Sequence, residues 1–498
     1  MVLSSLLVAA TAFGQQGDVA SKYASVITPA ALKEKLSVIA GAGMEGRETA
    51  TPGQKKAAAY IENYFKKIGL QPGTPNGYQL QYPVYQDSLI AATLSINGAP
   101  AEMTKDFTLS PAFLAEGNWH ANDVIFASYG LSDSAINNFD GLDVSNKWAM
   151  VIDGTPADMD STDAAKSYAN LRANRMKPNN IKARNIKGLL IIRRDFPGQS
   201  TTSLKGNMYM DKKPNSVPVI YISLKMASSI LQQPLNSFKD LKNVIRGVYP
   251  ASLSFNEQKA TLNLNSSDVI GVLPGTDKKS EYVFVTGHYD HLGKKGNTIW
   301  YGADDDGSGT TSVLQIATAF ARAKKDGHGP RRTMVFMTVS GEEKGLWGSE
   351  YYTDHPQFPL DSTSVDLNID MVGRIDPDYK GDSLNYVYTI GEDKLSSDLF
   401  PISDSINKQY ISMELDRRFN DPNDPNRFYY RSDHFNFAKH GVPVIFYFNG
   451  VHADYHQPTD TVDKINFNLM AKRVKLVYYT AWAMANRDNM VKRDIPLK

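Results

Sequence analysis

The chain has 498 residues, of which 42% are hydrophobic and 21% are charged, and its formal net charge is +1. This length predicts two or three domains of ordinary globular composition, and the near-neutral charge argues against a general nucleic-acid binder, because neutralising phosphates needs a basic excess. The sequence has no cysteine, which excludes disulfides, thiolate zinc sites and cysteine nucleophiles, so any metal must be held by histidine and carboxylate side chains.

The first 16 residues form an apolar run that ends in small and polar residues. This pattern is typical of the apolar region and cleavage site of a secretory signal, although no Lys or Arg precedes it; the alternatives are a mis-called start codon or a buried N-terminal segment. The run is too short to span a bilayer, and no later segment is apolar enough to do so. We therefore expect residues 1–16 to resemble a signal peptide and the protein to be exported, to the periplasm, the cell surface or the extracellular space of a bacterium.

Residues 24–105 are predicted to form the N-terminal part of the main domain, with two helices between residues 30 and 70. The second helix is expected to begin after Thr51, where a capping residue type precedes a proline in the first turn. Apolar residues then recur at helical spacing, and Gly69 is expected to end the helix.

Residues 106–255 differ from the preceding segment in their pattern of apolar and polar residues. Short apolar runs, among them "KWAMVIDG" and "KGLLIIRRD", are separated by polar loops that contain glycine and proline. Such runs predict buried strands with few strong helices between them. We expect a β-rich insertion here.

From residue 256 to residue 498, strand and helix signals alternate. Apolar strand-like runs end at Gly287, Gly341, Asp370 and Phe448, and a helix is predicted over residues 310–325. This alternation predicts an α/β fold with a mixed, largely parallel sheet flanked by helices. In such sheets, ligands bind beyond the carboxyl ends of the strands.

Each of these strand ends carries or precedes histidine or carboxylate side chains. These are the ligand types that remain for zinc in a chain without cysteine. Four strands that present such residues at one edge of a sheet are hard to explain by chance. The side chains are His288, Asp290 and His291; Asp304, Asp305 and Asp306; Glu342 and Glu343; Asp370; and His452, Tyr455, His456 and Asp460.

Two zinc ions in a co-catalytic site lie about 3.5–4 Å apart and need a ligand that can bridge them. An aspartate with one oxygen for each ion can do so. A further carboxylate, which is not a ligand, must accept the proton of the activated water. The adjacent pair Glu342 and Glu343 offers one ligand and one base.

Five motifs resemble those of the co-catalytic zinc peptidase family that includes the secreted bacterial leucine aminopeptidases, with glutamate carboxypeptidases and glutaminyl cyclases as relatives. The likeness covers residues 30–90 and 265–485, and it implies the fold of the zinc exopeptidases. The insertion resembles a protease-associated domain. The motifs are "GHYDHLG", "GADDDGSGT", "SGEEKGLWGS", "NIDMVGR" and "DYHQPTDT".

The resemblance implies which side chains hold the two ions. His288 and Asp370 would bind one zinc ion. Glu343 and His456 would bind the other, and Asp305 would bridge the two. The family also has a cis peptide bond directly after the bridging aspartate. Histidine and carboxylate ligands suit several divalent ions, so manganese or cobalt could replace zinc.

His452 competes with His456 for the role of ligand. We favour His456 because it lies in "YHQPTD", where Pro458 argues against one helix that presents both histidines. In the aspartate triplet, Asp304 and Asp306 are expected to set the geometry of the residue between them.

Three further side chains are given catalytic roles. Asp290 is expected to accept the second ring N–H of His288 and so to fix its tautomer. The resemblance implies that Glu342 is the general base and that Tyr455 donates a hydrogen bond to the developing oxyanion. The chain is therefore expected to be an exported zinc-dependent metallopeptidase that hydrolyses peptide bonds with water activated by two metals. Aminopeptidase activity, which releases N-terminal residues from a peptide substrate, is expected first.

The family leaves alternatives open: a carboxypeptidase or dipeptidase, a glutaminyl cyclase, and a receptor-like binding module that has lost catalysis. Arg374 or Arg431 could hold a substrate carboxylate or could be structural. The turn-rich loop Phe419–Phe435 could be a wall of the substrate pocket or a surface loop. The sequence leaves the oligomeric state open.

Overall fold

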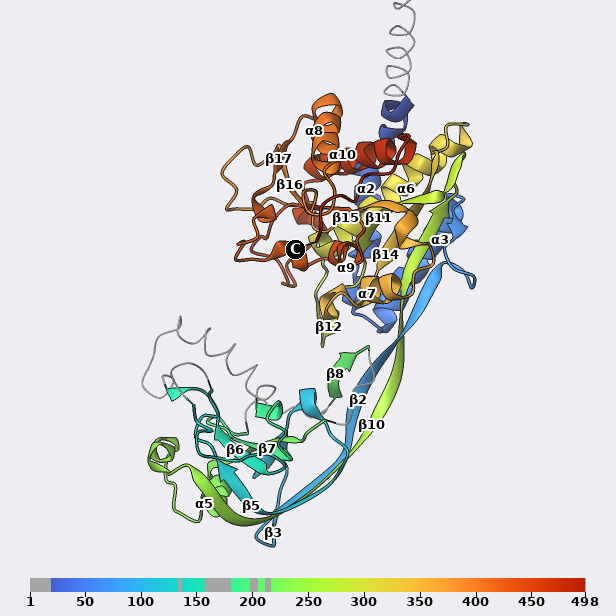
Figure 1. Cartoon of the computed structure of the whole chain (residues 1–498). Helices are drawn as coiled ribbons and strands as arrows, with labels where there is room; N and C mark the ends of the chain where they lie inside the picture. The colour runs from blue at the N-terminus through green and yellow to red at the C-terminus, as the bar shows by residue number, and fades with distance from the viewer. Residues whose placement is uncertain (1–18, 133–136, 157–180, 198–204, 211–215, 498) are drawn as a thin grey trace, which may run out of the picture. The chain divides into compact units, whose positions relative to one another are not determined.

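The computed structural model describes residues 19–132, 137–156, 181–197, 205–210 and 216–497 (Figure 1). The expected signal segment, residues 1–16, lies outside these ranges. The chain divides into two compact units, which we call unit 1 (Met1–Pro83 and Asn265–Lys498) and unit 2 (Val84–Leu264). Among the described residues, no helix is both long and apolar enough to cross a membrane.

Unit 1 is built on a mixed sheet in which four neighbouring strands run parallel, in the order β18, β15, β11 and β14. On either side of this group, β16 and the last residues of β10 run antiparallel to their neighbours, and β17 is parallel to β16. This sheet confirms the predicted fold class. The strands are β1 (Gln71–Pro72), β10 (Gly247–Leu273), β11 (Lys278–His288), β14 (Arg332–Val339), β15 (Thr363–Ile369), β16 (Tyr386–Ile390), β17 (Glu414–Asp416) and β18 (Val444–Phe448), with a separate hairpin of β12 (Lys294–Lys295) and β13 (Thr298–Ile299).

Helices cover both faces of this sheet. Alternate side chains of a strand point to opposite faces, so Val283 and Val285 of β11 enter the core shared with α2, α3, α6 and α10, whereas Phe284 enters the core shared with α7 and α9. The helices are α2 (Pro29–Ile39), α3 (Pro52–Lys67), α6 (Gly309–Lys325), α7 (Trp347–Asp354), α8 (Leu399–Tyr410), α9 (His434–Lys439) and α10 (Phe467–Asn486).

Helix α3 begins at Pro52, as the sequence predicted. The Thr51 hydroxyl does not cap the helix; it donates a hydrogen bond to the Glu48 carbonyl at 2.6 Å instead. The helix ends at Lys67, and Gly69 follows with a positive φ of 82°, which is the conformation that glycine allows after a helix.

Unit 2 contains a second group of four parallel strands, β5, β6, β7 and β9, with β10 and β4 antiparallel at its two sides. Its apolar side chains form two cores of their own, one of which includes α5 (Leu224–Leu231). The strands are β2 (Gln79–Ile96), β3 (Ala99–Ala101), β4 (Phe107–Leu109), β5 (Gly117–Phe126), β6 (Trp148–Ile152), β7 (Gly188–Ile192), β8 (Lys205–Tyr209) and β9 (Val219–Ile222).

The limits of unit 2 differ from those expected for the insertion, residues 106–255. Two long strands explain the difference, because β2 and β10 each continue from one unit into the other without a break in their pattern. No turn or change of composition therefore marks the boundary in the sequence. The resemblance of the insertion to a protease-associated domain stays a prediction.

Candidate metal site

The carboxyl ends of the parallel strands in unit 1 bring the expected ligands together. His288 is the last residue of β11, and Asp370 directly follows β15. The His288 Nε2 lies 3.3 Å from Asp305 Oδ1 and 3.7 Å from Asp370 Oδ1. These three side chains form the first group of the site.

A second group lies on the other side of Asp305. The His456 Nε2 lies 3.1 Å from Asp305 Oδ2 and 3.2 Å from Glu343 Oε2. One oxygen of Asp305 therefore faces His288 and the other faces His456, which is the arrangement that a bridging carboxylate needs.

Both groups fit zinc. Ligand atoms at about 2.1 Å from a tetrahedral zinc ion stand roughly 3.4 Å apart, close to the separations in both groups. The Nε2 of His288 and the Oδ2 of Asp305 are buried and make no hydrogen bond with the described residues. Since buried polar atoms are normally satisfied, these orphaned atoms are what a site for two cations would present.

The outer aspartates of the triplet are engaged by the protein itself. Asp304 accepts hydrogen bonds from the Gly373 N–H at 2.7 Å and from His452 Nε2 at 3.1 Å. Asp306 accepts three backbone N–H groups, those of His288, Gly309 and Met371. The peptide bond between Asp305 and Asp306 is cis, as the resemblance implied.

Asp306 also lies within ligand range of His288 and Asp370. Because its two oxygens already accept backbone N–H groups, Asp305 is the better ligand. His452 is likewise occupied by Asp304, which leaves His456 as the histidine of this loop that faces the second group.

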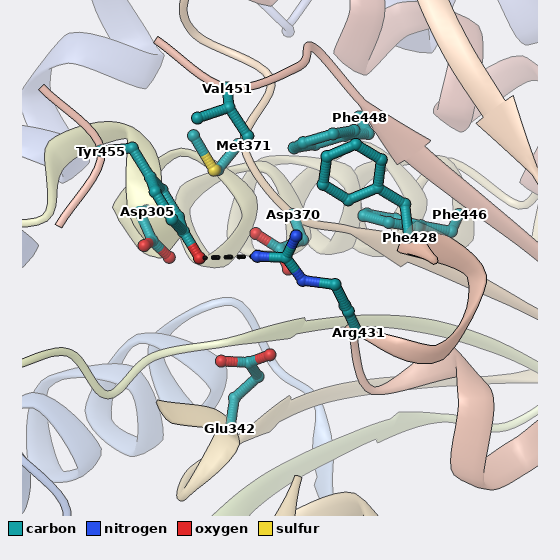
Figure 2. Close-up of a pocket in the computed structure, with 10 residues that line it drawn as sticks. All are labelled: Asp305, Glu342, Asp370, Met371, Phe428, Arg431, Phe446, Phe448, Val451 and Tyr455. Carbon is teal, nitrogen blue, oxygen red and sulfur yellow. Dashed lines mark hydrogen bonds between the residues drawn. The ribbon is translucent and has the colours of Figure 1, made fainter. Parts of the chain in front are cut away.

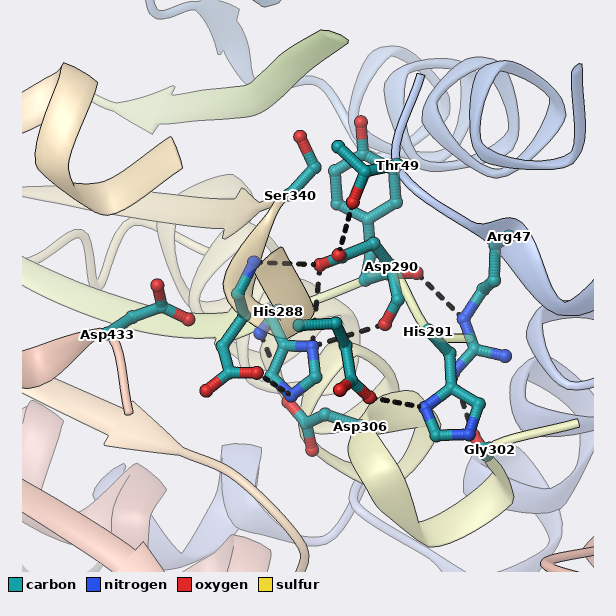
Figure 3. Close-up of polar contacts among 12 residues, drawn as sticks. Arg47, Thr49, His288, Asp290, His291, Gly302, Asp306, Ser340 and Asp433 are labelled. Atoms are coloured by element: carbon teal, nitrogen blue, oxygen red, sulfur yellow. Dashed lines mark hydrogen bonds and ion pairs between the residues drawn. The ribbon is translucent and has the colours of Figure 1, made fainter. Parts of the chain in front are cut away.

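Asp290 links three parts of the site (Figure 3). Its carboxylate accepts the Thr49 hydroxyl at 2.7 Å and the Glu342 N–H at 3.3 Å. The His288 Nδ1 lies 3.2 Å from the Asp290 carbonyl oxygen and 3.6 Å from its carboxylate. Asp290 is thus placed to orient His288, mainly through its backbone oxygen.

Glu342 lines a pocket together with Asp305 and Asp370 (Figure 2). Its Oε2 lies 3.9 Å from His288 Nε2, at the edge of the first group. Burial raises the pKa of Glu342 well above its usual range, and the neighbouring His288 opposes this shift. A half-buried carboxylate that faces the pocket beside the ligands is a suitable proton acceptor.

Tyr455 also lines this pocket, and its ring stacks on the His456 ring with 3.9 Å between the ring centroids. Burial raises the pKa of the Tyr455 hydroxyl, which therefore stays protonated as a donor. The loop Phe419–Phe435 contributes Phe428 and Arg431 to the lining, which favours the interpretation of this loop as a pocket wall. The remaining lining residues are apolar: Met371, Phe446, Phe448 and Val451.

His291 belongs to the site but received no role from the sequence. It is fully buried, and its Nδ1 lies 2.8 Å from Glu343 Oε1 and 3.9 Å from Asp305 Oδ2. The second histidine of "HYDH" was the available signal, but the resemblance assigned only the first histidine of that segment.

Arg47 was also missed. Its guanidinium is fully buried and donates hydrogen bonds to the carbonyl oxygens of Tyr289 at 2.7 Å and Tyr301 at 2.6 Å. It also donates to the carbonyl oxygen of Gly302 at 2.7 Å (Figure 3). The backbone carbonyl oxygen of Asp305 accepts a further hydrogen bond from it at 3.3 Å. This one side chain joins the segment after β11 to the loop that carries Asp305.

Ser432 positions Asp370. Its hydroxyl donates to Asp370 Oδ2 at 2.7 Å and accepts a hydrogen bond from Asn368 Nδ2 at 2.9 Å. The Oδ1 of Asp370 is thereby left toward His288.

Parts of the chain are similar to known peptidases. Residues 268–481 match the model of peptidase family M28. The chain is 35% identical over 117 residues to aminopeptidase YwaD of Bacillus subtilis, a match that spans 23% of this chain and 24% of that protein. The chain thus matches well under two thirds of this relative's length.

Solved structures share the fold across nearly the whole chain. An aminopeptidase from Aneurinibacillus sp. strain AM-1 superimposes with a TM-score of 0.55 at 17% identity, over 96% of this chain and all of that one. A zinc aminopeptidase from Bacillus subtilis superimposes with a TM-score of 0.51 at 20% identity, over 93% and 96% of the two chains. At these identities the likeness speaks for the fold alone.

Proposed function

We propose that the chain, whose residues 268–481 match the model of peptidase family M28, is a zinc-dependent metallo-exopeptidase, and specifically an aminopeptidase. The observation that carries the proposal is the two-sided placement of Asp305 between His288 and His456. The similarity of part of the chain to aminopeptidase YwaD supports the choice of reaction. Export is part of the proposal and is supported by the signal-like pattern of residues 1–16.

The residues of the two groups suit a pair of divalent ions. His288 and Asp370 would hold one, His456 and Glu343 the other, with Asp305 shared. When bound, two such ions polarise a carbonyl and acidify water. Zinc is the expected metal, and manganese or cobalt suits the same ligand types.

The chain's own residues would supply the remaining chemistry. Glu342 would accept the proton of the attacking water and return it to the leaving amine. The Tyr455 hydroxyl would donate a hydrogen bond to the oxygen of the scissile carbonyl as its charge develops. Asp290 would keep His288 in its orientation.

The central experiment compares the purified protein with its Glu342→Gln variant. We expect both to hold equal amounts of metal, while the variant loses turnover by about a hundred- to ten-thousandfold, because a positioned base contributes about 10²–10⁴-fold. Metal content by elemental analysis and hydrolysis of matched peptides with free or acetylated N-termini are the measurements. A chelator is included as a second condition.

Each outcome has a distinct meaning. Hydrolysis that needs a free amine and is stopped by the chelator supports an aminopeptidase. Hydrolysis that needs a free carboxyl end instead would indicate a carboxypeptidase. Metal without hydrolysis of any peptide would favour the receptor-like module, and near-normal turnover by Glu342→Gln would remove this side chain from the mechanism.

A further inference from the structure

The pocket beside the metal groups contains one positive charge that the proposed mechanism does not use. Arg431 lines the pocket and points into it from the loop before α9 (Figure 2). The charged residues that share the pocket with it are Asp305, Glu342 and Asp370, and each of these already has a role as ligand or base. The inference below rests on the proposed function and concerns what this arginine recognises.

The two arginines left open by the sequence have different surroundings. Arg374 pairs with Asp454 at 2.9 Å and lies 3.9 Å from Asp460, so its charge is already compensated within the protein. Arg431 makes no ion pair with any carboxylate of the described residues; its polar contact is the Tyr455 hydroxyl at 3.4 Å. Only Arg431 therefore has a charge available for a ligand.

The guanidinium of Arg431 is held in place without being neutralised. It lies 4.9 Å from the centroid of the Phe428 ring, in a cation–π contact, and one NH2 group reaches Tyr455. A guanidinium has five N–H donors arranged in a planar fork that matches a carboxylate. Apart from the contact with Tyr455, these donors make no side-chain hydrogen bond with the described residues.

The charges of the site favour an anionic ligand at this position. With two divalent ions in place, the three ligand carboxylates leave the metal groups with a net positive charge of about one, and Glu342 offsets it. The negative groups across the pocket are then compensated, whereas Arg431 is not. An uncompensated guanidinium on an otherwise apolar wall is a recognition element for carboxylates.

We propose that Arg431 binds a carboxylate of the substrate close to the scissile bond. The chain would then act fastest on peptides that carry such a group within about one residue of the bond, either as the α-carboxylate of a dipeptide or as an acidic side chain. The apolar lining of Met371, Phe446 and Phe448 would receive the neighbouring apolar part of the substrate.

The test uses four substrates on the metal-loaded protein: Leu-Leu, Leu-Leu-amide, Glu-Leu-amide and Gln-Leu-amide. The ratio of kcat/KM between a carboxylate substrate and its neutral partner is the readout, because it cancels general damage to the site. The variants are Arg431→Gln, Arg431→Lys and the control Arg427→Gln. Arg427 lies in the same loop and is exposed, as Arg431 is, but its guanidinium lies over Tyr430 rather than in the pocket lining.

We expect Arg431→Gln to lower the ratio by about 10- to 100-fold, the worth of hydrogen bonds to a charged group. Arg431→Lys should recover part of the loss, since it keeps the charge but not the fork. Arg427→Gln should leave the ratio unchanged. A drop confined to Leu-Leu assigns the α-carboxylate, and a drop confined to Glu-Leu-amide assigns the acidic side chain. An unchanged ratio in Arg431→Gln for both pairs overturns the proposal.

A binding experiment separates this proposal from the proposed function. If no peptide is hydrolysed, the same pairs are titrated by calorimetry into Glu342→Gln and into the double variant Glu342→Gln/Arg431→Gln. A carboxylate preference that disappears in the double variant supports the role of Arg431 even though the activity proposal has failed. Equal binding of carboxylate and amide by Glu342→Gln rejects it.

Discussion

Each unit contains four parallel strands, yet among the described residues only the strand group of unit 1 brings a cluster of candidate metal ligands together at its ends. In unit 1, β11 and β15 end at His288 and just before Asp370. In unit 2, β6 and β9 end just before Asp153 and Ser223, and among the described residues the candidate metal groups all lie in unit 1.

This contrast separates two contributions to a site. A group of parallel strands places its carboxyl ends along one edge, whatever the sequence. The chemistry depends on which side chains stand at that edge and on whether the protein leaves their polar atoms unsatisfied. Unit 2 has such an edge, but among the described residues no candidate metal group lies there. The apolar side chains of its buried strands pack into the two cores of the unit.

The largest difference between the two units is expected on removal of Asp305, the proposed shared ligand. Asp305→Ala is expected to reduce the metal content from two ions to less than one and to lower peptide hydrolysis by about a thousandfold or more, because both groups lose a ligand and their common charge. Elemental analysis and steady-state kinetics measure these effects.

The matched control is Asp153→Ala, at the end of β6 in unit 2, where the carboxylate accepts the Gly154 N–H at 3.0 Å. It should keep both the metal and the activity. If Asp305→Ala still holds two ions, the bridging role is wrong and Asp306, which lies in ligand range of His288 and Asp370, becomes the candidate.

The second prediction concerns the buried carboxyl of unit 2. Glu257 accepts the Ala115 N–H at 3.0 Å, and burial raises its pKa from 4.5 to about 7, with Lys259 opposing the shift and Asp87 adding to it. The folded state therefore binds more protons than the unfolded state between pH 4.5 and pH 7. Across this window the stability of unit 2 should fall as pH rises, by at most about 3 kcal/mol.

The measurement is hydrogen exchange of the β5 and β6 amides between pH 5 and pH 8, corrected for intrinsic exchange rates. Glu257→Gln should remove most of the pH dependence and be more stable than the parent at pH 8. Equal slopes in the two proteins would show that Glu257 is ionised in the folded state at neutral pH.

The smallest expected effect is that of His291. Its 2.8 Å contact with Glu343 Oε1 leaves the other oxygen of this carboxylate toward His456. His291→Leu should weaken binding of the second ion by about 10- to 100-fold, the usual effect of losing a partner that orients a ligand. Metal titration calorimetry measures the affinity.

The isosteric variant His291→Asn decides how this side chain acts. An asparagine amide can replace the Nδ1–H donor, so it should recover most of the affinity if His291 positions Glu343. If the asparagine variant loses as much as the leucine variant, His291 is itself a ligand. His355→Asn, at an exposed position, is the neutral control.

The parts of the molecule that could be read from the sequence are those with a local signal. The buried strands of unit 1 and the start of α3 follow from apolar runs and from a proline in a first turn. The expected ligands could be proposed because they lie at or after strand ends, and strand ends converge. Even so, the limits of unit 2 could not be read, because β2 and β10 pass through them unbroken.

The missed residues act through contacts that have no sequence pattern. Arg47 recognises backbone carbonyl oxygens, which every residue has, so nothing in the sequence identifies its partners. Ser432 orients Asp370 from 62 positions away. His291 carries a suitable residue type, but spacing alone does not say whether a histidine faces a metal, a carboxylate or the core.

The reach of Arg47 has a consequence for the order in which the centre is assembled. Its carbonyl partners at residues 289, 301, 302 and 305 lie more than 240 positions further along the chain, and all of unit 2 lies between them. On the ribosome, Arg47 emerges long before the carbonyl groups to which it donates hydrogen bonds, and His456 emerges later still. During synthesis, Arg47 therefore lacks these carbonyl partners for a long stage, and the centre can close only after residue 456 has been made.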